Sequence, residues 1–180
     1  MANILLGVTG GIAAYKSADM ANKLVKNGHD IKVIMTRAAQ EFIAPLTFQT
    51  LTKHQVFTDM FDDPFAEDVK HISLAKWADI AVIAPCTANV IGKLANGIAD
   101  DMLTTVFMAT ATKKLICPAM NTAMYENVAV KRNIELLKGD GYCFVEPRES
   151  RLACGDVGKG ALATTEIIIE KIEGILREGN

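Results

Sequence analysis

The segment from residue 4 to residue 35 restricts the possible folds of this chain more than any other feature. Residues 4–8 form a short apolar run that ends in a glycine turn, which is typical of a buried parallel strand. Residues 12–27 carry an apolar stripe at helical spacing that stops at Gly28, and residues 31–35 are a second apolar run. This order predicts a right-handed βαβ unit.

The rest of the chain continues the same alternation. Apolar runs predict further strands at residues 79–84, 115–117 and 142–145, and helices are expected at residues 42–51, 101–110, 128–139 and 164–177. We therefore predict one doubly wound α/β domain over residues 1–180, Rossmann-like or flavodoxin-like, with a mostly parallel sheet and helices on both faces. Two stretches, at about 57–70 and 146–163, lack a regular pattern, and such long loops often act as lids or binding loops.

Composition excludes several classes of function. The net charge of −2 offers no basic patch for nucleic acid, and no apolar run is long enough to span a membrane. No two of the four cysteines have the CxxC spacing of a zinc or redox motif, so no metal site is expected. Because the chain opens directly on a strand-like segment without a signal sequence, we expect a cytoplasmic protein with free thiols.

The turn at Gly10-Gly11 lies at the carboxyl end of the first strand and opens a helix, where a parallel sheet binds its ligands. Glycines allow a close approach of the backbone to an anion, and the N–H groups that begin the helix favour a phosphate. The spacing does not match the dinucleotide fingerprint, and Tyr15 replaces a glycine that a Walker A loop requires. Thr36-Arg37 ends the second strand and suits a phosphate or ribityl group. A tight turn without ligand and a helix cap at Thr36 remain as structural alternatives.

Three later segments follow predicted strands or fall in the late irregular stretch: Pro85-Cys86-Thr87-Ala88-Asn89, Pro118-Ala119-Met120-Asn121 with Met124-Tyr125, and residues 151–160 with Ala-Cys-Gly-Asp. Together with His71, they resemble the motifs of the homo-oligomeric flavin-containing cysteine decarboxylases, with Tyr125 in place of a tryptophan. The resemblance covers residues 4 to about 162. It is most specific for the members that act on 4′-phosphopantothenoylcysteine in coenzyme A biosynthesis. Because the chain ends at Asn180, it resembles a stand-alone bacterial decarboxylase without a ligase domain.

The resemblance implies a reaction that needs FMN. The flavin transiently oxidises the substrate cysteine to a thioaldehyde, carbon dioxide then leaves, and the reduced flavin returns a hydride to give 4′-phosphopantetheine. The protein supplies binding, orientation and electrostatics for this cofactor chemistry. The resemblance also implies a trimer or a dodecamer of four trimers, with flavin at a subunit interface.

Specific residues take roles under this resemblance. Asn121 would hold the substrate carboxylate through a neutral amide, since a fixed positive charge would oppose loss of carbon dioxide. His71 would act as a base, and Cys154 would donate a proton. The predicted FMN contacts are Gly10, Gly11, Ile12, Thr36, Arg37, Thr87, Ala88, Asn89 and Ala119. The predicted substrate contacts are Asn121, Met124, Arg151, Ala153 and Lys159, with the last loop, at about 146–163, as a substrate clamp.

Two other functions remain compatible with these residues. A peptidyl-cysteine decarboxylase of lantibiotic-type peptide maturation shares the fold and the flavin. A non-catalytic flavin-binding regulatory subunit is the second, although its relatives carry long acidic tails that this chain lacks. A prenyl-flavin synthase on the same scaffold is expected to lack the His71, Asn121 and Cys154 set.

Overall fold

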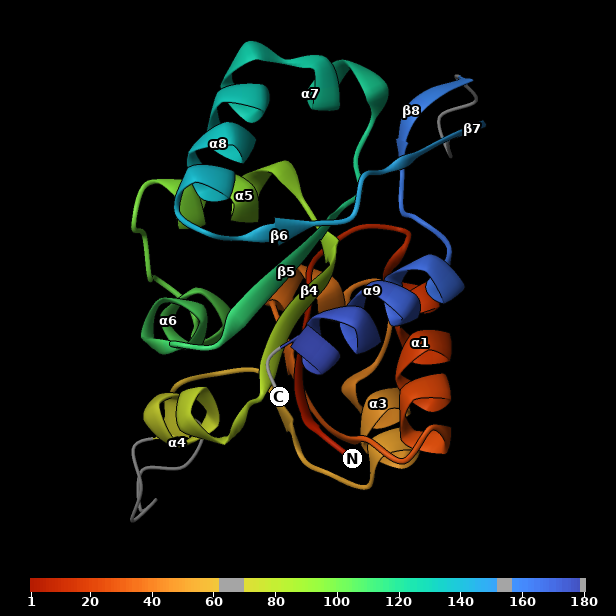
Figure 1. Cartoon of the computed structure of the whole chain (residues 1–180), viewed down its shortest axis with the longest axis vertical. Coiled ribbons are helices and arrows are strands. Elements are labelled where there is room, and N and C mark those ends of the chain that lie inside the picture. Colours follow the sequence, from red (N-terminus) through yellow and green to blue (C-terminus); the bar gives the residue numbers. More distant parts are fainter. Residues whose placement is uncertain (62–69, 152–156, 179–180) are drawn as a thin grey trace.

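The computed structural model describes residues 1–61, 70–151 and 157–178. Within this part of the chain, a parallel sheet of six strands has the order β3-β2-β1-β4-β5-β6 (Figure 1). The strands are β1 (Asn3–Val8), β2 (Asp30–Met35), β3 (Val56–Phe57), β4 (Ile80–Cys86), β5 (Lys113–Pro118) and β6 (Cys143–Phe144). Winding reverses between β1 and β4, which makes their carboxyl ends the expected ligand site of this topology.

Helices cover both faces of the sheet. Figure 1 shows α1 (Ala14–Lys26), α3 (Pro45–Thr52) and α9 (Thr165–Glu178) on one side, and α4 (Lys70–Trp77), α5 (Ala88–Ala95), α6 (Met102–Ala109) and α8 (Val128–Gly139) on the other. Two short helices, α2 (Arg37–Gln40) and α7 (Thr122–Glu126), lie in connections. The predicted doubly wound α/β fold is therefore confirmed.

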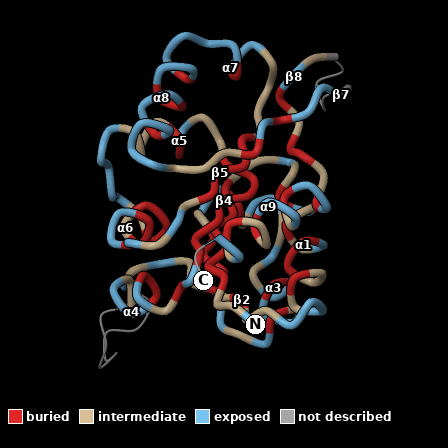
Figure 2. Tube along the Cα trace, in the orientation of Figure 1, coloured by how far each residue is buried: buried red, intermediate tan, exposed pale blue. Residues whose placement is uncertain are grey.

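The core is built by the alternation of side chains along the central strands. On β1, Ile4, Leu6 and Val8 pack with α1, α3 and α9, while Leu5 packs with the helices of the opposite face. All residues of β4 are buried, which explains its unbroken apolar sequence. Figure 2 shows the buried residues concentrated on the central strands.

A second, antiparallel sheet stands at the carboxyl edge of the main one. It is a hairpin of β7 (Arg148–Arg151) and β8 (Val157–Ala161). We predicted only irregular chain here, which was wrong for these two strands. Their polar and glycine-rich residues give no apolar alternation, so pairing between the two strands and contacts with the rest of the domain define them instead.

Two other boundaries differ from the prediction. The helix expected at residues 42–51 is α3, which begins later, at Pro45, where the missing N–H of proline is harmless. The short helix α2 before it was not predicted, and Thr36 caps it through Ala39 N. The third long strand does not stop at Pro85 but continues to Cys86 through an irregular register against β5. Asp101 caps the start of α6, since its carboxylate accepts from Thr104 N in a capping box.

Candidate active site

A cavity of about 560 Å³ opens at the carboxyl edge of the sheet, between the start of α1 and the β7–β8 hairpin. Eight of the residues predicted to contact cofactor or substrate line it. They come from three separate segments of the chain: Gly10, Gly11, Ile12, Thr87, Ala88, Ala119, Asn121 and Met124. The topology therefore brings the glycine turn and the two later motifs to one site.

Buried hydroxyl groups hold two of these segments together. Thr9 is fully buried, and its Oγ1 donates to the carbonyl of Pro85 at 2.8 Å and accepts from Thr87 N at 3.1 Å. Ser17 Oγ donates to the carbonyl of Ala84 at 2.6 Å. These bonds fix the start of α1 against the end of β4. Neither Thr9 nor Ser17 was among the residues predicted for the site.

The glycine turn presents backbone donors to the cavity. Within the described chain, no hydrogen-bond acceptor is found for the backbone N–H groups of residues 10–13, and α1 has neither a side-chain cap nor an acidic residue in its first turn. A Cβ atom on Gly10 would lie 2.4 Å from Ala38 Cβ, whereas one on Gly11 would meet nothing within 4 Å. Gly10 is therefore required for packing, and Gly11 leaves space for a ligand.

Asn121 lies where the loop after β5 enters α7. Its Oδ1 accepts from Ala123 N at 2.8 Å and caps that helix. The preceding residue, Met120, donates its N–H to the carbonyl of Gly160 on β8 at 2.9 Å. A Cβ atom on Gly160 would lie 2.3 Å from Met120 O, so only glycine permits this close contact between the hairpin and the Asn121 segment.

A network around Glu146 ties the base of the hairpin to α7. Glu146 Oε2 accepts from the Tyr125 hydroxyl at 2.7 Å and from Lys159 Nζ at 2.9 Å. The Lys159 and Tyr125 donors lower the pKa of Glu146, while burial and then Glu146 raise the pKa of Tyr125. Lys159, predicted to contact substrate, is engaged in this network and does not line the cavity.

Several predicted residues lie elsewhere. The side chains of Thr36, Arg37 and Asn89 are outside the cavity lining, and Thr36 Oγ1 accepts from Ala39 N at 3.2 Å. His71 lies on α4, at the opposite end of the molecule from the β7–β8 hairpin (Figure 1). Ala153 and Cys154 lie outside the described residues, as does the side chain of Arg151, whose backbone is part of β7.

The cavity also contains residues that the sequence analysis did not assign to it. Lys16 on α1 and Arg148 on β7 line it, together with Ser150 and the end of β8. Lys16 is the third residue of α1, within its first turn. Arg148 carried no signal, because it stands in a stretch without a recognisable motif.

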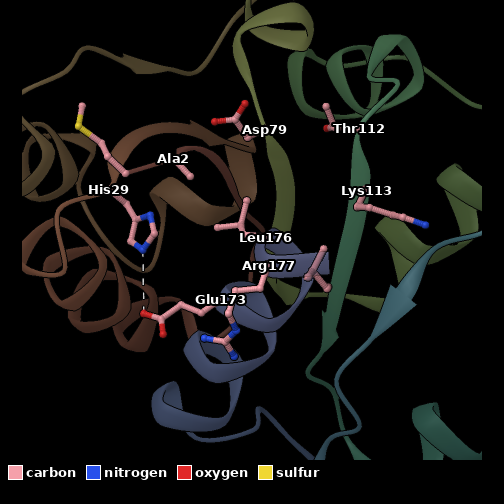
Figure 3. Close-up of a pocket in the computed structure, with 10 residues that line it drawn as sticks. Ala2, His29, Asp79, Thr112, Lys113, Glu173, Leu176 and Arg177 are labelled. Carbon is pink, nitrogen blue, oxygen red and sulfur yellow. Dashed lines mark ion pairs between the residues drawn. The ribbon is translucent and has the colours of Figure 1, made fainter. Parts of the chain in front are cut away.

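A second cavity of about 490 Å³ lies at the opposite, amino-terminal edge of the sheet. Figure 3 shows His29, Asp79 and Lys113 around it, with Glu173 and Arg177 from the end of α9. His29 Nε2 lies 4.0 Å from Glu173 Oε1, and Asp79 Oδ2 accepts from Asn3 N at 2.8 Å. Burial and then the Met1 ammonium group lower the pKa of His29, while Glu173 opposes this shift.

The described residues do not favour thiolate or metal chemistry. Cys86 and Cys117 are fully buried, and burial raises the pKa of both thiols, so neither provides a thiolate. No group of three or more metal-ligating side chains occurs in the described part of the chain. None of the helices in that part combines the length and the apolar character needed to cross a bilayer.

Comparisons with known proteins agree with this arrangement. The sequence model of the family described as Flavoprotein matches residues 1–177. A "Probable phosphopantothenoylcysteine decarboxylase" of Streptococcus mutans is 48% identical over 172 residues, covering 94% of this chain and 96% of the relative. The "Coenzyme A biosynthesis bifunctional protein CoaBC" of Bacillus subtilis is 55% identical over 171 residues, which are 95% of this chain but 42% of that relative's length.

Solved structures show the same similarity in three dimensions. A PPC decarboxylase mutant complexed with pantothenoylaminoethenethiol has a TM-score of 0.86 and 29% identity, with 96% of each chain covered. The FMN-dependent cysteine decarboxylase SpaF has a TM-score of 0.87 and 32% identity, with 99% of this chain and 97% of SpaF covered. The likeness therefore includes the cavity edge as well as the core.

Proposed function

The chain belongs to the flavoprotein family, and from this premise we propose that it is an FMN-dependent decarboxylase. Its substrate is 4′-phosphopantothenoylcysteine and its product is 4′-phosphopantetheine, within coenzyme A biosynthesis in the cytoplasm. The observation that carries the proposal is one cavity that combines the glycine turn at the start of α1 with Asn121 and Met124. The 48% identity over nearly the full length of the Streptococcus mutans relative supports the same activity.

The cavity fits FMN on the side of the glycine turn. The backbone N–H groups of residues 10–13 have no acceptor in the described chain and suit the phosphate of the cofactor. Thr87, Ala88 and Ala119 give the neighbouring wall small side chains that leave space for a flat ring. Bound FMN supplies the reversible two-electron oxidation that makes loss of carbon dioxide from a cysteine possible.

Asn121 and Met124 orient the substrate in this proposal. The Asn121 side chain binds the carboxylate without adding positive charge, so the ground state is not stabilised against loss of carbon dioxide. Met124 is about half exposed at the cavity, where its flexible side chain packs against the pantothenate arm. Cys154 donates the final proton in this proposal, and Arg151 and Ala153, its near neighbours in the sequence, contact the substrate.

His71 acts as a base across a subunit interface. Its helix, α4, lies far from the cavity of the same chain, so a second copy has to bring its own His71 to that site. Large apolar side chains are exposed around the starts of α1 and α3, at Ile12, Tyr15, Phe42 and Leu46. They support self-association as a trimer or as a dodecamer built from trimers.

The test compares substrates with the purified protein. We expect a yellow protein whose flavin absorption bleaches on reduction, and which releases carbon dioxide from 4′-phosphopantothenoylcysteine. A peptide that ends in cysteine serves as the competing substrate. Preference for the peptide would assign the chain to peptide maturation, and a flavin-loaded protein inert toward both would remove the decarboxylase function.

A further inference from the structure

The charges that line the cavity are of one sign. Among its described lining residues, Lys16 and Arg148 are the charged side chains, and no carboxylate faces them. They come from α1 and from β7, which are far apart in the sequence and both reach this cavity. Two cations in a partly enclosed site favour a ligand with about two negative charges.

Neither cation is neutralised by a carboxylate of the described residues. In the described chain, no carboxylate forms an ion pair with Lys16 or Arg148, whereas Lys23, Lys93, Lys138 and Lys159 are all paired. Arg148 Nε donates to the carbonyl of Leu162 at 3.3 Å, which leaves the remaining guanidinium donors for a ligand. Burial and then the charge of Arg148 lower the pKa of Lys16, as expected for two cations that share one space.

We propose that Lys16 and Arg148 bind the terminal phosphate of the substrate and so select phosphorylated over unphosphorylated pantothenoylcysteine. This inference rests on the proposed function, and it assigns a ligand to two residues that no motif marked. The turn at residues 10–13 already offers backbone donors for the cofactor phosphate, so the cations are left for a second phosphate. Lys159, the earlier candidate, is bound to Glu146 outside the cavity.

The positions of charge and neutrality follow the chemistry of the reaction. The substrate loses its carboxylate charge, and a neutral side chain, Asn121, stands at the motif expected to bind it. The phosphate charge does not change between substrate and product. Cations there stabilise the ground state and the transition state equally, which lowers KM and leaves kcat unaltered. Removing them should therefore change KM alone.

The experiment uses the FMN-loaded protein with Lys16→Gln, Arg148→Gln and the double variant. A charge-assisted hydrogen bond contributes about 1.5–3 kcal/mol, so each single variant should raise KM for 4′-phosphopantothenoylcysteine roughly 10- to 100-fold. We expect kcat to stay near the wild-type value, and turnover of unphosphorylated pantothenoylcysteine to be unchanged. Lys26→Gln on the same helix and the exposed Arg177→Gln at the other edge are matched controls.

Two results would overturn the inference. An equal loss of activity toward the phosphorylated and the unphosphorylated substrate would show that the cations do not recognise the phosphate. Weaker FMN binding, with the preference for phosphorylated substrate intact, would assign the cations to the cofactor. Binding of 4′-phosphopantetheine and pantetheine, followed through flavin fluorescence, makes the same comparison without turnover. A wild-type protein that prefers 4′-phosphopantetheine but is inactive would thus contradict only the proposed function.

Discussion

The two cavities at opposite edges of the sheet have similar volumes, about 560 and 490 Å³, but different electrostatics. At the amino edge, basic and acidic groups occur together: His29 lies beside Glu173, and Asp79 accepts a hydrogen bond from Asn3 N. At the carboxyl edge, Lys16 and Arg148 lack carboxylate partners and the glycine turn has N–H groups without acceptors. The amino edge also holds two buried polar atoms without a hydrogen-bond partner in the described chain, His29 Nδ1 and Thr112 Oγ1. The difference between the edges is therefore one of charge: groups of both signs line the amino edge, whereas unpaired cations and free N–H groups at the carboxyl edge indicate an anionic ligand.

The two edges of the sheet also differ in the backbone groups that they present. Parallel strands end at the carboxyl edge with the helix N-termini pointing toward it, so the edge favours anions before any side chain is considered. The amino edge receives the carbonyl end of α9 and has no such preference. The described side chains reinforce this difference rather than create it.

Adding a negative charge to the carboxyl-edge cavity should have the largest effect. In Asn121→Asp, the new carboxylate keeps the cap on Ala123 N, so we expect an unchanged melting temperature. Two like charges about 4 Å apart repel by about 4 kcal/mol at an effective dielectric constant of about 20. Because solvent screens part of this repulsion, kcat/KM should fall roughly 10²- to 10³-fold.

The measurement for Asn121→Asp is steady-state decarboxylation alongside FMN titration. FMN binding should remain within a few-fold of the wild type, because Asn121 is assigned to the substrate. Wild-type kcat/KM in this variant would contradict the carboxylate role of Asn121 and weaken the contrast between the two cavities.

The adjacent glycines offer a second, smaller effect. In Gly10→Ala the new Cβ would lie 2.4 Å from Ala38 Cβ and 2.8 Å from Ala38 C, so backbone has to move. Overpacking of this kind typically destabilises by about 1–3 kcal/mol, or about 3–10 °C in melting temperature for a chain of this size. Gly11→Ala should keep the stability of the FMN-free protein, because its Cβ has open space, but should weaken FMN binding.

Thermal unfolding with and without FMN checks this pair. Equal stability of the two FMN-free variants would refute the packing role of Gly10. Unchanged FMN affinity in Gly11→Ala would show that the cofactor does not approach the turn as closely as the donors of residues 10–13 indicate.

The sequence predicted the part of the site that depends on sheet topology. Thr87, Ala88, Ala119 and Asn121 follow strands whose apolar runs were evident, and parallel pairing brings their ends together. Arg148 could not be found this way, because it reaches the cavity through a hairpin with no apolar pattern. The position of a side chain in such a segment depends on tertiary contacts, here the close approach of Gly160 to Met120, which no local pattern encodes.

The resemblance to a known family predicted site residues, such as His71, that the fold of a single chain does not place at the cavity. Thr36 illustrates the limit from the opposite side: a hydroxyl at a strand end suited a phosphate, and the structure gives it a capping bond within α2. Strand-end position is thus not a sufficient condition for a ligand contact in this fold.

The smallest expected effect tests the amino-edge cavity through pH. The folded state lowers the pKa of His29, mainly by burial, so the unfolded chain binds the proton first as pH falls through the ordinary histidine value of about 6.5. The free energy of unfolding should therefore be level above about pH 7. It should decrease as pH falls below about 7, until the lowered pKa of the folded state is reached. We expect a small decrease in melting temperature from this group. His29→Gln should remove that component, while His54→Gln, on the partly exposed histidine beside Asp30, should retain it. If His29→Gln kept the full slope, His29 would not be the group responsible for it. If inorganic phosphate stabilised the wild type through His29 rather than through Lys16 and Arg148, the amino-edge cavity would be an anion site as well. The contrast between the two edges would then fail.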